Sequence, residues 1–179
     1  MGTVINIQAH SALYTLQVKE MNMDSRETAQ ALMDSVQRGR FDTARTFLSD
    51  DFQISGFAPK PLNSKKWLNM IANLKMACAD LNYHFQVDGA EGNIIHTSSQ
   101  LSGTNSGAFD FTDIDMGVIS ATNKKFSSTR QPIKITVKGD KVTSWAVEPT
   151  EGAGWTAILS QLGVNVLAPK AKSKGRNHK

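Results

Sequence analysis

Residues 126–147, with the sequence FSSTRQPIKITVKGDKVTSWAV, decide the fold class of this chain. In the first half, apolar residues alternate with polar ones, which predicts one long strand over 126–137 with a single apolar face. That face carries Ile133, Ile135 and Val137. The Lys-Gly-Asp-Lys segment at 138–141 predicts a turn, and strand character resumes over 142–147. The stretch therefore predicts two adjacent antiparallel strands.

The same period of two begins upstream, at residue 81. Apolar side chains alternate with polar ones there, at Tyr83, Phe85 and Val87. The segment 88–93 contains two glycines and predicts a hairpin turn, after which 94–101 forms the partner strand. Residues 102–115 are rich in Gly, Asn and Asp and predict a loop, followed by a short strand at 118–121. The second half of the chain is therefore predicted to be a meander.

Helical spacing dominates the chain before residue 81. Asp24 and Glu27 form a capping-box pattern, and apolar residues then recur at helical spacing until Gly39. A second short helix is predicted over 41–48, and a brief strand over 52–54. We therefore expect two helices before the first strand.

A third helix follows, and Asn63 or Ser64 can cap it. Its apolar residues form one stripe, made of Trp67, Ile71, Leu74 and Cys78. A short terminal helix is predicted over 155–162, between Pro149 and Gly163.

Helices first and antiparallel strands second predict an α+β fold. We expect a cone in which a curved, mixed or antiparallel sheet wraps around the three N-terminal helices and encloses a pocket. This domain is predicted over 24–168, between an N-terminal extension (1–23) and a basic, disordered tail (169–179). Five of the 20 Lys and Arg lie in the last ten residues, which hold no acid, so the net charge of +4 describes the tail.

Four short pieces of sequence match a known family in order and spacing. They are GTNSG at 103–107, ATNKKF at 121–126, VTSW at 142–145, and the segment 155–163 ending in SQLG. Over residues 25–165 the chain resembles the SnoaL-like polyketide cyclase branch of the NTF2-like superfamily. The resemblance implies a pocket for a hydrophobic carbonyl compound, proton transfer by an acidic residue without metal or cofactor, and a homodimer.

Two positions of the family pattern are altered here. Asn105 occupies the place of a His, and it can donate a hydrogen bond but cannot titrate. The acid expected after the strand tryptophan falls near Pro149, so Glu148 is the best substitute base and Glu151 the next. Catalytic candidates are therefore Glu148 and Asn105. The alternative for Glu148 is a solvated carboxylate at the end of a strand.

Aromatic residues on the predicted helix and strands are candidates for the pocket wall. A flat ligand would stack on Trp67, Tyr83, Phe85 and Trp145. The alternative is that these side chains only pack in the core.

Other titratable residues suggest weaker sites. His84 and His96 lie on the two predicted hairpin strands and could be cross-strand neighbours, acting together in proton transfer or as metal ligands. The favoured alternative is that each is a hydrogen-bonded or outward-facing strand residue. A loop of the pattern D-x-x-D-x-D, formed by Asp110, Asp113 and Asp115, suggests calcium but does not satisfy the EF-hand pattern. Cys78 is expected to be a small core residue. We therefore expect no metal and no cofactor.

A single cysteine favours a reducing compartment, and the N-terminal residues lack a secretory signal pattern. No window approaches the ~20 apolar residues of a membrane span. These features predict a cytoplasmic protein.

Two functions remain open from the sequence. The first is a pocket protein for a hydrophobic small molecule, enzyme or not. The alternative is a noncatalytic, dimeric ligand carrier or protein-interaction module. Contact with nucleic acid through the Lys-rich tail is a third, weaker interpretation, because the tail lacks interleaved aromatic residues.

Overall fold

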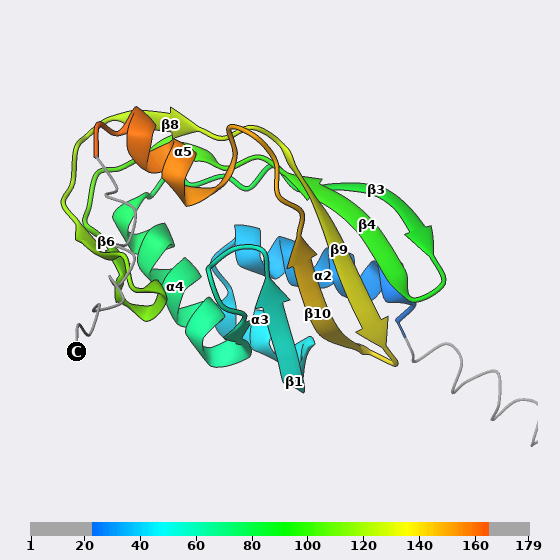
Figure 1. Cartoon of the computed structure of the whole chain (residues 1–179). Coiled ribbons are helices and arrows are strands. Elements are labelled where there is room, and N and C mark those ends of the chain that lie inside the picture. The colour runs from blue at the N-terminus through cyan, green and yellow to red at the C-terminus, as the bar shows by residue number, and fades with distance from the viewer. Residues whose placement is uncertain (1–22, 165–179) are drawn as a thin grey trace, which may run out of the picture.

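The computed structural model describes residues 23–164 (Figure 1). The predicted basic tail, and residues 1–22 of the predicted extension, lie outside the described residues. No helix among residues 23–164 is both long and apolar enough to cross a membrane.

Two helices open the described chain, as predicted. Helix α2 (Ser25–Gln37) begins with a reciprocal capping box between Asp24 and Glu27, and Gly39 follows its end at a φ of 69°. Helix α3 (Phe41–Thr46) is shorter than expected, because the chain enters strand β1 (Leu48–Ser55) directly after it. The brief strand predicted at 52–54 is therefore the second half of a longer one.

Helix α4 (Ser64–Ala77) carries the predicted apolar stripe. The side chain of Asn63 accepts a hydrogen bond of 3.0 Å from the backbone N–H of Lys66 and caps the helix. Trp67, Ile71 and Leu74 are all buried. The stripe therefore faces the core, and Cys78 lies at its end.

A six-stranded mixed sheet forms the main layer. Its order is β2 (Leu62–Asn63), β1, β10 (Lys141–Val147), β9 (Gln131–Lys138), β4 (Ile94–Ser99) and β3 (Gln86–Glu91). Only β1 and β10 run parallel, and the other neighbours are antiparallel. Helix α2 lies across β4, β9 and β10, and α4 packs beside β1 (Figure 1). The predicted α+β architecture, with helices on one face of a curved sheet, is confirmed.

Two small sheets and a last helix close one end of the molecule. Strand β5 (Ser102–Thr104) pairs with β8 (Lys125–Ser127), and β6 (Phe109–Phe111) pairs with β7 (Gly117–Ile119) around a 3-10 turn at Thr112–Ile114. Helix α5 (Gly154–Gln161) lies against β8 (Figure 1). The prediction of one loop over 102–115 is therefore wrong in part, because β5 and β6 lie within it.

The strand predicted over 126–137 is in fact two strands in different sheets. Its first part, β8, pairs with β5, whereas its second part, β9, pairs with β4 and β10. Between them, Ser128 exchanges hydrogen bonds with the backbone of Leu101 at 2.8 and 3.0 Å. These bonds turn the chain from one sheet to the other.

The hairpin strand predicted from Tyr83 starts later, at Gln86. His84 has a φ of 44°, and Asn82 Oδ1 accepts a hydrogen bond of 2.8 Å from its backbone N–H. This turn interrupts the alternation that the sequence shows.

The apolar face of β9 points inward. Ile133, Ile135 and Val137 are each at most 3% exposed. They therefore belong to the core and do not form an exposed apolar face of the sheet.

Candidate ligand-binding cavity

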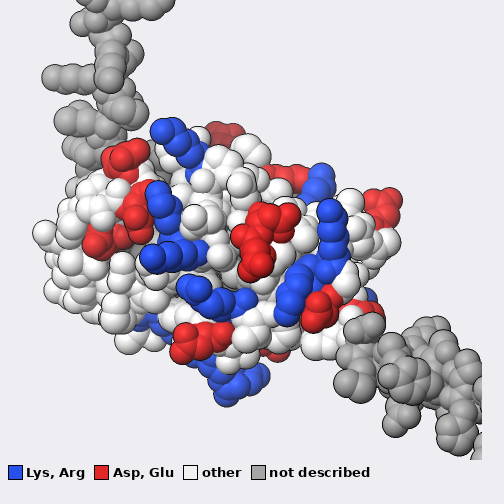
Figure 2. Space-filling view, turned by 90° about the horizontal axis from the view of Figure 1, so that it is seen from below, with Lys and Arg blue, Asp and Glu red and all other residues white. Residues whose placement is uncertain are grey.

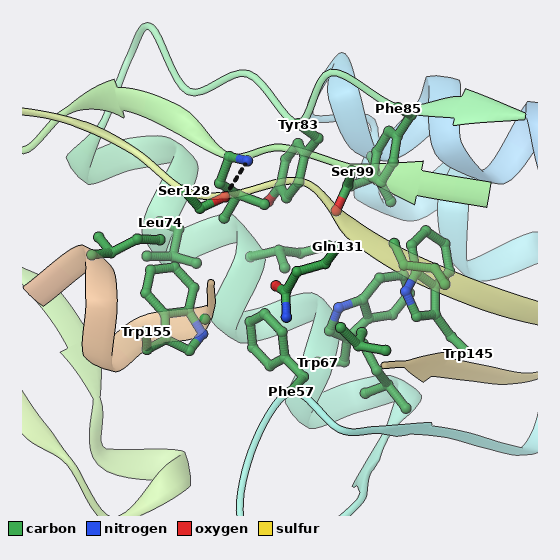
Figure 3. Close-up of a pocket in the computed structure, with 18 residues that line it drawn as sticks. Phe57, Trp67, Leu74, Tyr83, Phe85, Ser99, Ser128, Gln131, Trp145 and Trp155 are labelled. Atoms are coloured by element: carbon green, nitrogen blue, oxygen red, sulfur yellow. Dashed lines mark hydrogen bonds between the residues drawn. The ribbon is translucent and has the colours of Figure 1, made fainter. Parts of the chain in front are cut away.

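A cavity lies between α4, the inner face of the sheet and helix α5 (Figure 3). Its wall is mostly aromatic and aliphatic, and the aromatic members are Phe57, Trp67, Tyr83, Phe85, Trp145 and Trp155. Its polar members are Ser99, Ser128 and Gln131. Tyr83 is the only titratable side chain among the described lining residues.

The four aromatic residues predicted for the pocket form one continuous wall. Trp67 and Trp145 have ring centroids 5.3 Å apart, and Phe85 meets Trp145 edge-on at 5.7 Å. Phe85 stacks on Tyr83 at 5.1 Å with an angle of 2° between their planes. Alternation along the strand explains the position of Trp145, because it shares the inner face of β10 with Val147. Contact of these residues with a ligand stays a prediction.

The opposite wall comes from the loop after β1 and from helix α5. Phe57 follows Gly56 in the loop after β1 and meets Trp155 edge-on at 5.5 Å. Trp155, in the first turn of α5, also packs against Phe111 at 4.7 Å. Sequence reasoning missed Phe57, whose only signal was an apolar residue within a Gly- and Pro-rich loop.

Two hydrogen-bond donors, one from each wall of the cavity, have no partner among the described residues. They are the hydroxyl of Tyr83 and the indole N–H of Trp155, and both atoms are buried. Burial raises the pKa of the Tyr83 phenol above its ordinary value, with a smaller contribution from the nearby Cys78. The phenol is therefore a neutral donor at physiological pH. A buried donor left without an acceptor costs about 1–3 kcal/mol.

Gln131 places its amide within the cavity (Figure 3). It is the first residue of β9, and its Nε2 lies 3.5 Å from the carbonyl oxygen of Glu148. No sequence signal pointed to it, because one polar residue at the start of a strand is ordinary.

The cavity is small. The space open to the centre of a water-sized sphere is about 40 Å³. A cavity of roughly 150 Å³ holds benzene, and pockets for drug-sized ligands are larger still. In this state of the protein, the cavity therefore does not hold even one aromatic ring.

Glu148 lies outside the cavity. Its Oε1 is 2.8 Å from Nζ of Lys134, and both side chains are about half exposed. It shares the outer face of β10 with Ala146, because Trp145 and Val147 point inward. This position gives its carboxylate no access to the cavity, so the geometry does not support it as the base. Glu151 is exposed and is not part of the lining either.

The side chain of Asn105 joins two loops through hydrogen bonds. Its Oδ1 accepts hydrogen bonds from the backbone N–H and hydroxyl of Thr122 at 2.8 and 2.9 Å. Its Nδ2 donates to the carbonyl of Gly107 at 2.6 Å. The side chain is fully buried, lies outside the cavity lining, and has its amide engaged at both ends. This arrangement does not support a catalytic role.

The two histidines are not cross-strand neighbours, so the weaker possibility that they act together is not supported. His96 lies opposite Gly89, and its Nε2 is 3.6 Å from a carboxylate oxygen of Glu91. His84 precedes β3 and bonds the hydroxyl of Ser102 at 2.8 Å. The turn at His84 separates them along the ladder.

The other candidates have structural roles. Asp110 accepts hydrogen bonds from the backbone N–H and hydroxyl of Thr112, which close a turn. Burial raises the pKa of the Cys78 thiol to about 12, and the hydrogen bond that it donates to Asp80 adds to this rise. Within residues 23–164, no group of three or more His, Cys, Asp and Glu is arranged to hold a metal ion.

Charges of both signs are interspersed on the face shown in Figure 2. That face therefore presents no continuous basic surface of the kind that binds nucleic acid.

No protein-family model and no curated protein matches this sequence. Solved structures do match it. IdmH, a proposed polyketide cyclase from Streptomyces antibioticus, is 18% identical with a TM-score of 0.59, over 79% of this chain and 100% of that chain. A proposed SnoaL-like polyketide cyclase from Jannaschia sp. CCS1 is 16% identical with a TM-score of 0.56, over 69% and 83%.

The chain has the fold of the SnoaL-like polyketide cyclases. A protein from Catenulispora acidiphila with a ketosteroid isomerase-like fold, in complex with trimethylamine, is similar too. It is 13% identical with a TM-score of 0.53, over 78% of this chain and 94% of that chain. The SnoaL-like fold expected from the four sequence pieces is therefore confirmed.

Proposed function

We propose that this protein binds a small, neutral, apolar molecule that carries a hydrogen-bond acceptor. The observation that carries the proposal is that two side chains of an apolar cavity wall, Tyr83 and Trp155, each hold a buried donor with no partner among residues 23–164. A carbonyl or ether oxygen of a ligand would accept from them and remove the cost of their burial. A polyketide, the ligand that the resemblance implies, would be larger than this cavity of about 40 Å³, so the ligand is smaller or the cavity opens.

The charge of the ligand follows from the lining. The described lining residues include no Lys, Arg, His, Asp or Glu, so nothing there would balance a charged ligand. Moving an ion from water into such surroundings costs several kcal/mol or more. A neutral ligand avoids this cost.

The same lining favours a ligand carrier over a cyclase or isomerase. Removal of a proton next to a carbonyl needs a base within hydrogen-bond reach. Among the described lining residues Tyr83 is the only titratable group, and its raised pKa makes it a donor rather than a base. Cofactor-independent proton transfer therefore becomes the second candidate, supported by the fold and by the donor on Tyr83.

Two further proposals concern partners and location. Homodimer formation rests on the resemblance alone. A cytoplasmic location rests on the single buried thiol of Cys78. Contact with nucleic acid is not proposed for the described residues.

The test uses a pair of probes that differ in one acceptor. Cyclopentanone and methylenecyclopentane have nearly the same shape, but only the ketone accepts a hydrogen bond. We expect the protein to prefer cyclopentanone and the indole N–H signal of Trp155 to shift on titration, as followed by NMR. Tyr83→Phe should weaken cyclopentanone binding about 2- to 12-fold, the worth of one hydrogen bond, and leave the hydrocarbon unaffected.

The matched control is Thr28→Val. The Thr28 hydroxyl is also buried without a partner in the part of the chain that the structure describes, but Thr28 is not part of the lining, so cyclopentanone affinity should not change. Equal affinity for the two probes, or no binding of either, would contradict the proposed function.

A further inference from the structure

We propose that the side chain of Gln131 is a plug that occupies the binding cavity of the empty protein and sets the largest ligand that can enter. This inference rests on the proposed function, because a plug has a role only where a ligand binds.

The size of the cavity is the first argument. Gln131 projects its amide among the aromatic side chains of the wall (Figure 3), and the space beside it measures only about 40 Å³. This is well below the roughly 150 Å³ that holds benzene. The amide therefore takes up room that a ligand with one ring would need.

The weak attachment of the amide is the second argument. Its Nε2 donates one long hydrogen bond of 3.5 Å, to the carbonyl of Glu148. A polar amide in apolar surroundings with one poor hydrogen bond is held only weakly. A ligand that displaces the amide to the rim would therefore lose little hydrogen-bond energy.

The firm attachment of the backbone is the third argument. Gln131 pairs with Ser99 in the β4–β9 ladder, and next to it Pro132 O accepts a hydrogen bond of 2.9 Å from the backbone N–H of Glu148. A change of side-chain rotamer therefore opens the cavity without a change in the sheet. Such a change takes place within nanoseconds for side chains that are not tightly packed.

The experiment compares ligand size across variants at position 131. Benzene and naphthalene are titrated against the wild type, Gln131→Ala, Gln131→Met and the control Gln53→Ala, with binding followed by NMR. Ala removes the plug, whereas Met keeps its length and bulk without the amide. Gln53 lies in β1 with an exposed side chain outside the cavity lining.

We expect Gln131→Ala to gain about tenfold in benzene affinity and clearly less in naphthalene affinity, because the freed space admits the first ring and not the second. Gln131→Met and Gln53→Ala should keep the size preference of the wild type. The thermal unfolding midpoint is measured for the wild type and the three variants, to establish that each protein is folded.

The outcomes separate this inference from the proposed function. If all four proteins bind both probes with the same size preference, the plug is overturned and the ligand-binding function stands. If Gln131→Ala alone binds the probes, the plug is supported and the wild type loses its proposed function for ligands of this size. Absence of binding in every variant overturns the plug, whereas the proposed function is decided by cyclopentanone, which carries the acceptor that benzene and naphthalene lack.

Discussion

Nζ of Lys134 lies 2.8 Å from Oε1 of Glu148 on the outer face of the β9–β10 ladder. This ion pair holds the carboxylate on the side of the sheet away from the cavity. The hydrogen bond and the charge of Glu148 raise the pKa of Lys134, so the amine stays charged over a wider range of pH.

Replacement of Glu148 should leave ligand binding intact. We expect Glu148→Gln to bind cyclopentanone as the wild type does, because the carboxylate has no access to the cavity. The pKa of Lys134 should fall toward its ordinary value, which NMR titration of the amine would detect. A loss of ligand affinity in Glu148→Gln would contradict the position of this carboxylate outside the cavity.

Replacement of Asn105 should affect stability rather than binding. Asn105→Ala leaves the backbone N–H of Thr122 and the carbonyl of Gly107 without their side-chain partner. We expect a loss of about 1–3 kcal/mol in the free energy of unfolding, measured with urea, and unchanged cyclopentanone affinity. Asn105→Asp should cost more, because it places a carboxylate against the Gly107 carbonyl. If Asn105→Ala kept its stability but no longer bound cyclopentanone, Asn105 would have a role in ligand binding.

Gly56 should tolerate no side chain. It has a φ of 76°, and a Cβ atom there would lie 1.9 Å from the carbonyl oxygen of Val147. We expect Gly56→Ala to destabilise the protein by more than about 3 kcal/mol, since the clash adds to the strain of a positive φ.

Gly92→Ala is the matched control for Gly56. Gly92 also has a positive φ, of 60°, but a Cβ atom there would meet nothing within 4 Å. Its replacement should therefore cost only about 1–2 kcal/mol. Similar losses for the two variants, measured by urea unfolding, would argue against the close approach of Gly56 to β10.

The thiol of Cys78 should be unreactive and should make stability sensitive to alkaline pH. Its pKa is about 12 in the folded protein against 9.0 for an unperturbed thiol. As the pH rises past about 9, the unfolded chain loses this proton first, so the stabilisation is complete below pH 9 and disappears as the pH approaches 12.

Two measurements check the behaviour of Cys78. Iodoacetamide at pH 8 should label the protein in urea but not the native protein, as read by mass spectrometry. The stability of Cys78→Ala should fall less steeply between pH 9 and 11 than that of the wild type. Rapid labelling of the native protein would show that the thiol is more accessible than the structure indicates.

Local signals in the sequence predicted the helices well. The capping box of Asp24 and Glu27 and the stripe that begins at Trp67 act within a few residues, so the structure retains them. The strand over 126–137 was predicted wrongly, because the hydrogen bonds that turn the chain at Ser128 come from Leu101, 27 residues away. Contacts at that separation leave no local pattern.

The site was predicted only in part, because some of its residues carry a local signal and others depend on contacts far apart in the sequence. Alternation places Trp145 on a defined face, and the aromatic character of Tyr83 and Phe85 indicated a pocket wall. Gln131 carried no signal, because its importance depends on the volume left by side chains from other elements. For Glu148, the sequence could not decide which face of β10 is the inner one, and the partner Lys134 became visible only in the sheet.

The parallel pairing of β1 with β10 also affects how the chain folds. Leu48 lies beside Val142, and Ile54 beside Trp145, so the sheet joins segments from nearly opposite ends of the described chain. During synthesis, β1 has no neighbour other than the two residues of β2 until the last strand has been made. Pairing at such separation slows folding, because a long loop must close before the contact forms. A nascent chain that stops before Lys141 would therefore expose the edges of β1 and β9, and unpaired strand edges are prone to aggregation.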